Sequence, residues 1–162
     1  MTLACDIHEP TEYELRIFHE ASGRKLVAVV EIVSPSNKDR PESRRAFVAK
    51  CAALLHKGVS VAIVDICGTP NFNLYAQLLD WLGRADPAMA EEPSLYAAAC
   101  RGRSVRRKTR LETWAHVLEF GKPLPTLPIW LSDDLWITLD LEASYEETCR
   151  VLKVPPFSTS PN

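Results

Sequence analysis

The sequence predicts an α/β domain with a mixed β-sheet, built around a central parallel β-α-β unit that is flanked by helices. Two segments, 26–33 and 59–66, are almost entirely apolar and have the length of strands that are buried on both faces. The segment 41–56 between them carries apolar residues at helical spacing. Two buried strands joined by a helix are expected to lie parallel, through a right-handed crossover.

The composition is that of an ordinary globular domain. The chain has 162 residues, 46% of them hydrophobic, and we expect one domain over 1–154 with a disordered tail over 155–162. The formal net charge of −2 excludes a strong overall attraction to nucleic acid or to an anionic membrane. The five cysteines form no Cys-x-x-Cys pair, and no signal-peptide pattern follows Met1. These features indicate a cytoplasmic protein with reduced thiols and no membrane segment.

The N-terminal part is expected to form a β-hairpin. Residues 13–19 alternate in part between apolar and polar side chains, and a short Ala-Ser-Gly turn precedes the next strand. If Ser22 and Gly23 lie at the centre of that turn, Glu14 is directly opposite Glu31 on the adjoining strand.

Two helices are predicted in the first half of the chain. The first begins at Pro41, which suits the first turn of a helix, and ends before Gly58. Its apolar stripe consists of Phe47, Val48, Cys51, Leu54 and Leu55. The second helix spans 71–82 and ends at Gly83. The segment 34–40, before the first helix, is expected to be a loop.

A second hairpin is predicted from the strands 96–100 and 111–118. The tip between them contains six basic residues, Arg101, Arg103, Arg106, Arg107, Lys108 and Arg110. These are enough to form a phosphate-binding finger, which makes nucleic acid a candidate partner. A solvated hairpin tip is the simpler interpretation, because no aromatic residue is interleaved there to stack on bases.

The C-terminal part is predicted to end in a strand and a helix. Three prolines within 123–128 require an extended segment, and residues 136–141 alternate like a strand. Ser144 and Glu147 have the spacing of a capping box, which predicts the start of a last helix that ends at Leu152.

Glu31 gives the strongest indication of a functional site. A carboxylate in an apolar central strand costs several kcal/mol unless it is paired, metal-bound or protonated. Two interpretations stay open, namely a buried ion pair with Arg44 or Arg45 and a site that carries chemistry. The antiparallel helix takes Arg44 and Lys50 past the level of Glu31, so these side chains can converge. A solvated helix lysine explains Lys50 equally well.

The segment after the first central strand is a candidate for substrate binding. Open α/β sheets place ligands beyond the carboxyl ends of their strands, and helix N-termini receive anions there. Ser34 and Lys38 lie in this segment and Arg44 follows it, so these three residues are candidates for contacts with substrate phosphates. Ordinary turn and capping chemistry explains the serine equally well. Asp65 ends the next strand and is either a supporting acid or a cap.

One pattern in these residues resembles family 4058 of bacterial domains of unknown function. The hallmark of that family is an apolar strand that ends in Glu-x-x-Ser-Pro-x-Asn-Lys, and the segment from Val29 to Lys38 has this form. Further matches are Lys50, Gly58-Val59, Ile63-Val-Asp65, Asn71-Phe-Asn-Leu-Tyr75, Leu95-Tyr-Ala97, Pro123-Leu-Pro125 and Leu139-Asp-Leu-Glu-Ala-Ser-Tyr145. The likeness covers nearly the whole chain.

That family is similar in turn to restriction-endonuclease-like proteins of the PD-(D/E)XK superfamily. The resemblance implies a restriction-endonuclease-like core and Mg²⁺ as the cofactor. By the same resemblance, Glu14 and Glu31 would hold the metal and Lys50 would lie beside the attacking water, so that all three would be catalytic. Val33 stands where the superfamily motif has its lysine, and Lys50 would replace it from the helix.

Two functions follow from the resemblance. The favoured one is a non-catalytic or degenerate relative that acts as a binding module, with Glu31 locked to Arg44 or Lys50. The alternative is a Mg²⁺-dependent phosphodiesterase or nuclease that acts on nucleic acid, with Lys38 or the 101–110 tip on the phosphates.

Overall fold

The computed structural model describes residues 13–20, 23–89, 93–105 and 108–154. The elements along the chain are β1 (Tyr13–His19), β2 (Lys25–Ile32), α1 (Pro35–Lys38), α2 (Pro41–His56), β3 (Ser60–Asp65), α3 (Leu74–Trp81), the 3-10 helix η2 (Pro87–Met89), β4 (Tyr96–Val105), β5 (Lys108–Val117), β6 (Thr126–Trp130), β7 (Trp136–Asp140) and α4 (Leu141–Leu152). The predicted tail, the first residues of the chain, and Ser22, Arg106 and Arg107 lie outside the described part. None of the described helices is long and apolar enough to cross a bilayer.

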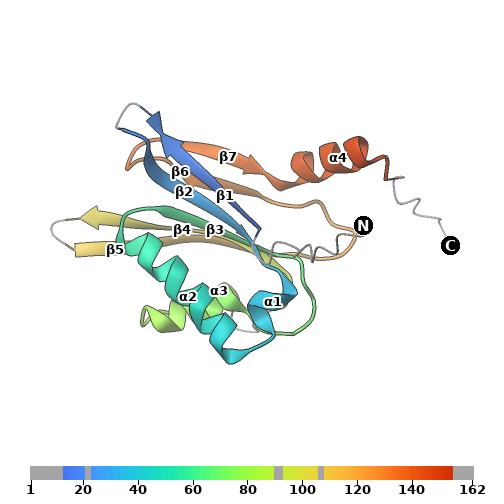
Figure 1. Cartoon of the computed structure of the whole chain (residues 1–162), viewed down its shortest axis with the longest axis horizontal. Coiled ribbons are helices and arrows are strands. Elements are labelled where there is room, and N and C mark those ends of the chain that lie inside the picture. The colour runs from blue at the N-terminus through green and yellow to red at the C-terminus, as the bar shows by residue number, and fades with distance from the viewer. Residues whose placement is uncertain (1–12, 21–22, 90–92, 106–107, 155–162) are drawn as a thin grey trace, which may run out of the picture.

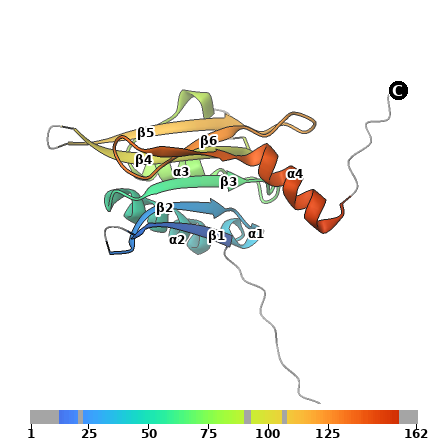
Figure 2. The same cartoon turned by 90° about the horizontal axis from the view of Figure 1, so that it is seen from above.

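A five-stranded mixed sheet forms the centre of the molecule, in the order β1-β2-β3-β4-β5. β2 and β3 run parallel, and the other neighbours are antiparallel, which confirms the predicted central parallel pair. Helices α1, α2 and α3 lie on one face of this sheet (Figure 1). The sequence predicted helices as the flanking elements, but the hairpin of β6 and β7 lies on the opposite face (Figures 1 and 2).

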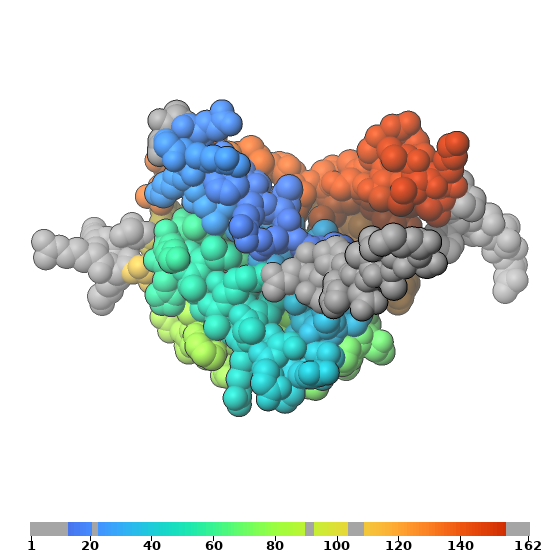
Figure 3. Space-filling model, viewed as in Figure 1, coloured from blue at the N-terminus to red at the C-terminus, as the bar shows by residue number. Residues whose placement is uncertain are grey.

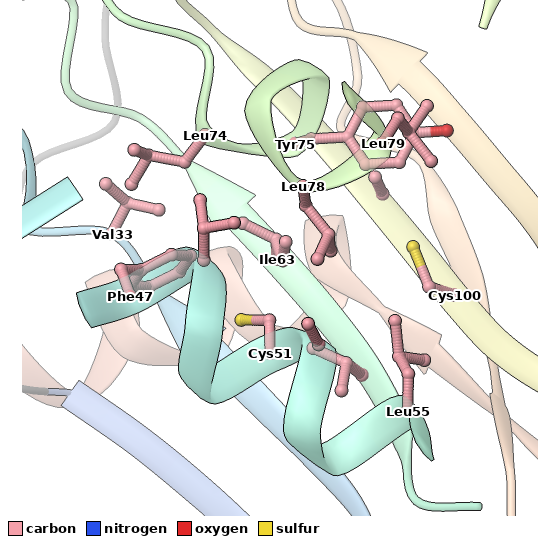
Figure 4. Close-up of a cluster of buried hydrophobic side chains, with 14 of the residues drawn as sticks. Val33, Phe47, Cys51, Leu55, Ile63, Leu74, Tyr75, Leu78, Leu79 and Cys100 are labelled. Carbon is pink, nitrogen blue, oxygen red and sulfur yellow. The ribbon is translucent and has the colours of Figure 1, made fainter. Parts of the chain in front are cut away.

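The two faces of the central sheet have different side chains. Toward the helices, Val61 and Ile63 of β3 pack with Leu55 of α2 and Leu78 of α3, part of a large apolar cluster (Figure 4). Toward β6, the sheet presents mostly alanine and valine, and Leu127 and Ile129 cover them. The residues of the sheet on this second face are Ala28, Val30, Ala62, Val64, Ala97 and Ala99. β3 is therefore buried on both sides, as its apolar sequence predicted.

Helix α2 has the bounds that the sequence predicted. Pro41 occupies its first turn, and Gly58 follows its end with φ of +75°, a backbone conformation that favours glycine. The predicted loop before it contains a short helix, α1, that begins after Ser34. The Ser34 backbone N–H donates to Asn37 Oδ1 at 2.8 Å, which gives this single turn its own cap.

The starts of α3 and α4 differ from the prediction because another residue supplies the cap. Asn73 Oδ1 accepts from the backbone N–H of Ala76 at 2.8 Å, so α3 begins three residues later than the apolar pattern. Asp140 Oδ1 accepts from the backbone N–H of Ala143 at 2.9 Å, so α4 begins directly after β7. The capping box predicted at Ser144 was wrong, because Ser144 already lies inside the helix and its hydroxyl donates to the Asp140 carbonyl.

A fully buried ion pair ties α1 to the end of β3. Lys38 Nζ donates to both carboxylate oxygens of Asp65, at 2.8 and 3.0 Å, and to the carbonyl of Cys67 at 2.6 Å. Both side chains are shielded from solvent. The backbone N–H of Cys67 also donates to Asp65, so the pair fixes the turn after β3 together with α1.

We expect Lys38→Met to lower the free energy of unfolding by about 3–5 kcal/mol, because it leaves the Asp65 carboxylate buried without its cation. The double variant Lys38→Met with Asp65→Asn should lose less, since no unpaired charge remains. Urea denaturation followed by circular dichroism measures both. A loss below about 1 kcal/mol in the single variant would show that Asp65 is compensated by other groups.

Candidate functional site

Two glutamates meet on neighbouring strands at the edge of the sheet. Glu14 of β1 lies directly opposite Glu31 of β2, as the hairpin register predicted. The register shifts only farther along, between Ile17 and Phe18, so the glutamate pair keeps regular antiparallel geometry. Glu31 lies between apolar residues on its own strand and is only 2% exposed. The structure therefore contains the buried carboxylate that the sequence indicated.

Lys50 of α2 reaches both carboxylates. Its Nζ lies 2.9 Å from Glu31 Oε2 and 3.6 Å from Glu14 Oε2. Glu14 is also paired with Arg16 on its own strand. The partner of Glu31 is thus Lys50 and not Arg44 or Arg45, the two arginines considered from the sequence: Arg44 donates to the Lys38 carbonyl, and Arg45 is exposed. The three residues proposed as catalytic from the resemblance, Glu14, Glu31 and Lys50, form one cluster.

The electrostatics of this cluster are dominated by the burial of Glu31. Burial raises the pKa of Glu31 above its ordinary range, and the hydrogen bond and positive charge of Lys50 offset only part of that rise. The neighbouring charge of Glu14 raises the pKa of Glu31 further. Oε1 of Glu31 is buried and has no hydrogen-bond partner among the described residues. The cluster therefore holds one carboxylate oxygen that a cation or a proton would stabilise.

An open pocket of about 340 Å³ lies beside this cluster. Its lining consists of Ser36, Asn37, Asp39, Arg40, Ser43, Ala46, Phe47 and Lys50. The side chain of Lys50 is 28% exposed, so one side of it faces solvent while its ammonium group holds Glu31. Arg40 and the two serine hydroxyls add donors to this pocket. Sequence reasoning did not single out Arg40 or Ser43, because polar residues at the exposed start of a helix are common.

The three residues predicted to bind substrate make contacts inside the protein. The Ser34 side chain takes part in the cap of α1. Lys38 is buried against Asp65, so its ammonium group cannot meet a phosphate unless that ion pair breaks. Arg44 donates to the Lys38 carbonyl at 2.9 Å and lies over the ring of Phe72, 3.8 Å from its centroid. These three residues therefore hold α1 against its neighbours. The arginine that is exposed in the pocket beside α1 is Arg40.

Most of the segment 101–110 is strand and not the predicted hairpin tip, because β4 continues to Val105 and β5 begins at Lys108. Its first basic residue, Arg101, is occupied by an ion pair and a ring stack. Arg101 is 8% exposed, its Nε lies 2.7 Å from Glu112 Oε2, and its guanidinium lies 3.4 Å from the centroid of Trp130. Trp114 packs against Trp130 with ring centroids 5.7 Å apart. The sequence missed these aromatic neighbours because they come from outside 101–110. This cluster lies on the β6 side of the sheet, on the face opposite to Lys50.

A divalent cation would find two carboxylates in this site. Among the residues that the structure describes, no group of three or more His, Cys, Asp and Glu side chains could hold a metal ion. Mg²⁺ is commonly held by one or two carboxylates with several waters, so Glu14 and Glu31 match its minimal protein donor set. The Lys50 ammonium group competes for the same oxygens, and a metal would have to displace it.

Comparison of the chain with protein-family models, with curated proteins and with solved structures gives no match. The geometry of the cluster and the pocket beside it is therefore the basis for the functional argument.

We expect Lys50→Met to lower the free energy of unfolding by roughly 3 kcal/mol near neutral pH, because Glu31 keeps its burial and loses its cation. The matched control is Lys57→Met, which removes an exposed lysine just beyond the end of α2. Urea denaturation of both variants gives the comparison. Equal losses in the two variants would mean that Lys50 does not compensate Glu31.

The raised pKa of Glu31 predicts a specific pH dependence. The folded chain keeps the Glu31 proton at pH values where the unfolded chain has released it, so the stability contributed by this group is lost as the pH rises through the folded pKa. The free energy of unfolding of the wild type, minus that of Glu31→Gln, should therefore fall over this range. Thermal melts across a pH series test this, with Glu146→Gln as the exposed control. A difference that grows with pH would show that Lys50 lowers the pKa instead.

Proposed function

We propose that the chain is a degenerate relative of the PD-(D/E)XK nuclease-like superfamily and acts as a binding module. The observation that carries this proposal is the position of Lys50, whose ammonium group contacts both carboxylates that a metal would need. The proposal also draws on the resemblance of the segment from Val29 to Lys38. A mixed sheet with one parallel pair crossed by α2 is compatible with a restriction-endonuclease-like core.

An internal cation favours binding over cleavage for an electrostatic reason. Lys50 neutralises the pair of carboxylates without any ligand, so the site is stable in the absence of metal. A lysine that is held by Glu31 is also not free to activate a water molecule. Removal of Lys50 from this position would leave Glu31 buried next to Glu14, which is unfavourable unless a metal enters at the same time.

The ligand that best fits the pocket beside Lys50 bears phosphate. Arg40 contributes an exposed positive charge that Asp39, 3.8 Å away in the same lining, offsets in part. Ser36 and Ser43 contribute hydroxyl donors, and arginine and serine are residues that contact nucleic-acid backbones without reading sequence. The basic hairpin tip supplies a second candidate contact for a longer nucleic acid. The proposal includes a cytoplasmic location, which the unpaired buried thiols of Cys51 and Cys100 favour.

One observation favours the alternative, a Mg²⁺-dependent phosphodiesterase or nuclease. Oε1 of Glu31 has no hydrogen-bond partner in the described part of the chain, and a bound cation would satisfy it. Glu14 and Glu31 would then hold Mg²⁺, which supplies charge stabilisation for phosphodiester hydrolysis. With the metal bound, Lys50 would be displaced from the carboxylates and would be available to hold the attacking water or a phosphate oxygen.

Binding and cleavage assays distinguish the two functions. As a binding module, the protein should give no heat with Mg²⁺ or Mn²⁺ in calorimetry and should not nick a supercoiled plasmid. It should bind a fluorescent single-stranded oligonucleotide in a salt-dependent manner. Arg40→Glu should weaken that binding about tenfold, whereas Arg45→Glu, an exposed residue of α2 outside the pocket lining, should weaken it much less.

Two results would contradict the binding-module proposal. Plasmid nicking by the wild type that is lost in Glu31→Ala would establish the nuclease. Failure to bind the oligonucleotide at low salt would remove nucleic acid as the ligand. Equal nicking by the wild type and Glu31→Ala would assign the cleavage to a contaminating enzyme.

A further inference from the structure

β1 is an edge strand that the rest of the described chain leaves uncovered. It pairs with β2 on one side, and none of the described elements pairs with its other side. Helix α2 packs over β3 and β4, and β6 packs over β2, β3 and β4, so both outer layers are centred away from β1. Figure 2 shows β1 at one border of the central sheet, and Figure 3 shows its blue atoms at the surface.

This edge is apolar on the face toward β6 and carries Glu14 and Arg16 on the face toward the helices. Leu15 is 59% exposed and Tyr13 is 49% exposed on the β6 side, and Phe18 near the end of the strand is exposed as well. Natural edge strands are usually protected by charges, prolines or a covering element, because unpaired backbone groups invite another strand. The opposite edge, β5, has charged side chains at Arg110 and Glu112 and is approached by η2. β1 carries Glu14 and Arg16, but none of the described elements lies against its outer side.

We propose that β1 pairs antiparallel with β1 of a second copy of this chain, which joins the two central sheets into one continuous sheet. The inference is independent of the proposed function. The two-fold axis of such a pair is perpendicular to the sheet, since only that axis keeps facing side chains on the same face. One residue of β1 then lies opposite itself, and the side chains around it decide which residue that is.

The charges on β1 select the register centred on Leu15. A pair centred on Glu14 or on Arg16 places like charges directly opposite each other, which is unfavourable. A pair centred on Ile17 falls on the register shift between Ile17 and Phe18. With Leu15 at the centre, Glu14 of each copy faces Arg16 of the other. Leu15 packs on Leu15, and Tyr13 faces Ile17, so the strand is complementary to itself.

A cysteine cross-link tests this register directly. Residues opposite each other in an antiparallel pair have a Cα separation within the range that a disulfide spans. Under mild oxidation, Leu15→Cys should form a covalent dimer at least fivefold more than wild type, which controls for the native cysteines. Ile17→Cys and Tyr13→Cys should each remain at the wild-type level, and the double variant of these two positions should cross-link.

Sedimentation of the unmodified protein tests the association itself. The wild type should show a dimer whose fraction rises with concentration. Arg16→Glu should be monomeric, because Glu14 of each copy would then face a glutamate of the other copy. Circular dichroism and the urea midpoint verify that the variant is folded, as its exposed position leads us to expect. A wild type that stays monomeric at the highest concentration, or equal cross-linking by Leu15→Cys and Ile17→Cys, would overturn the proposal.

Discussion

The contact between Glu31 and Lys50 is the constraint on which the functional part of the structure depends. The Glu31 carboxylate is almost fully buried in β2 and needs a positive partner. Helix α2 provides it, because its packing places Lys50 within hydrogen-bond distance of Glu31. The contact therefore links the packing of α2 to the chemistry of the sheet. It also defines the wall of the neighbouring pocket, because the same lysine faces both the carboxylate and the solvent.

Two lysines of neighbouring helices meet acids of the parallel strand pair, with opposite consequences. Lys38 of α1 is sealed against Asp65, and burial raises the pKa of Asp65 while Lys38 counteracts that rise. Lys50 of α2 is partly open to water. The closed pair can hold the turn after β3 in place, but it cannot exchange its partner for a ligand. The open pair can do so, which is why the candidate site lies at Glu31 and not at Asp65.

The sequence was most informative where a strong local signal decided the structure. Pro41 and Gly58 bracket α2, so periodicity and turn residues were sufficient there. Glu14 lies opposite Glu31 as predicted, but only because the register shifts between Ile17 and Phe18, since the pairs nearer the turn are offset by one residue. Local signals failed where two residues can both cap a helix. At the start of α4 the sequence indicated Ser144, and the structure has Asp140. The fate of Lys38 could not be predicted, because the identity of its partner depends on how β3 ends beside α1.

The face of the central sheet that packs against β6 determines which substitutions the fold can accept. Alanines of β3 and β4 form much of this face, and their small side chains let the β6–β7 sheet approach closely. A bulkier side chain at Ala97 or Ala99 would lift the β6–β7 hairpin, yet these side chains point away from the helices and from Lys50. The layer that carries the hairpin can thus be remodelled in evolution or by design, while the layer that carries the carboxylates retains its geometry.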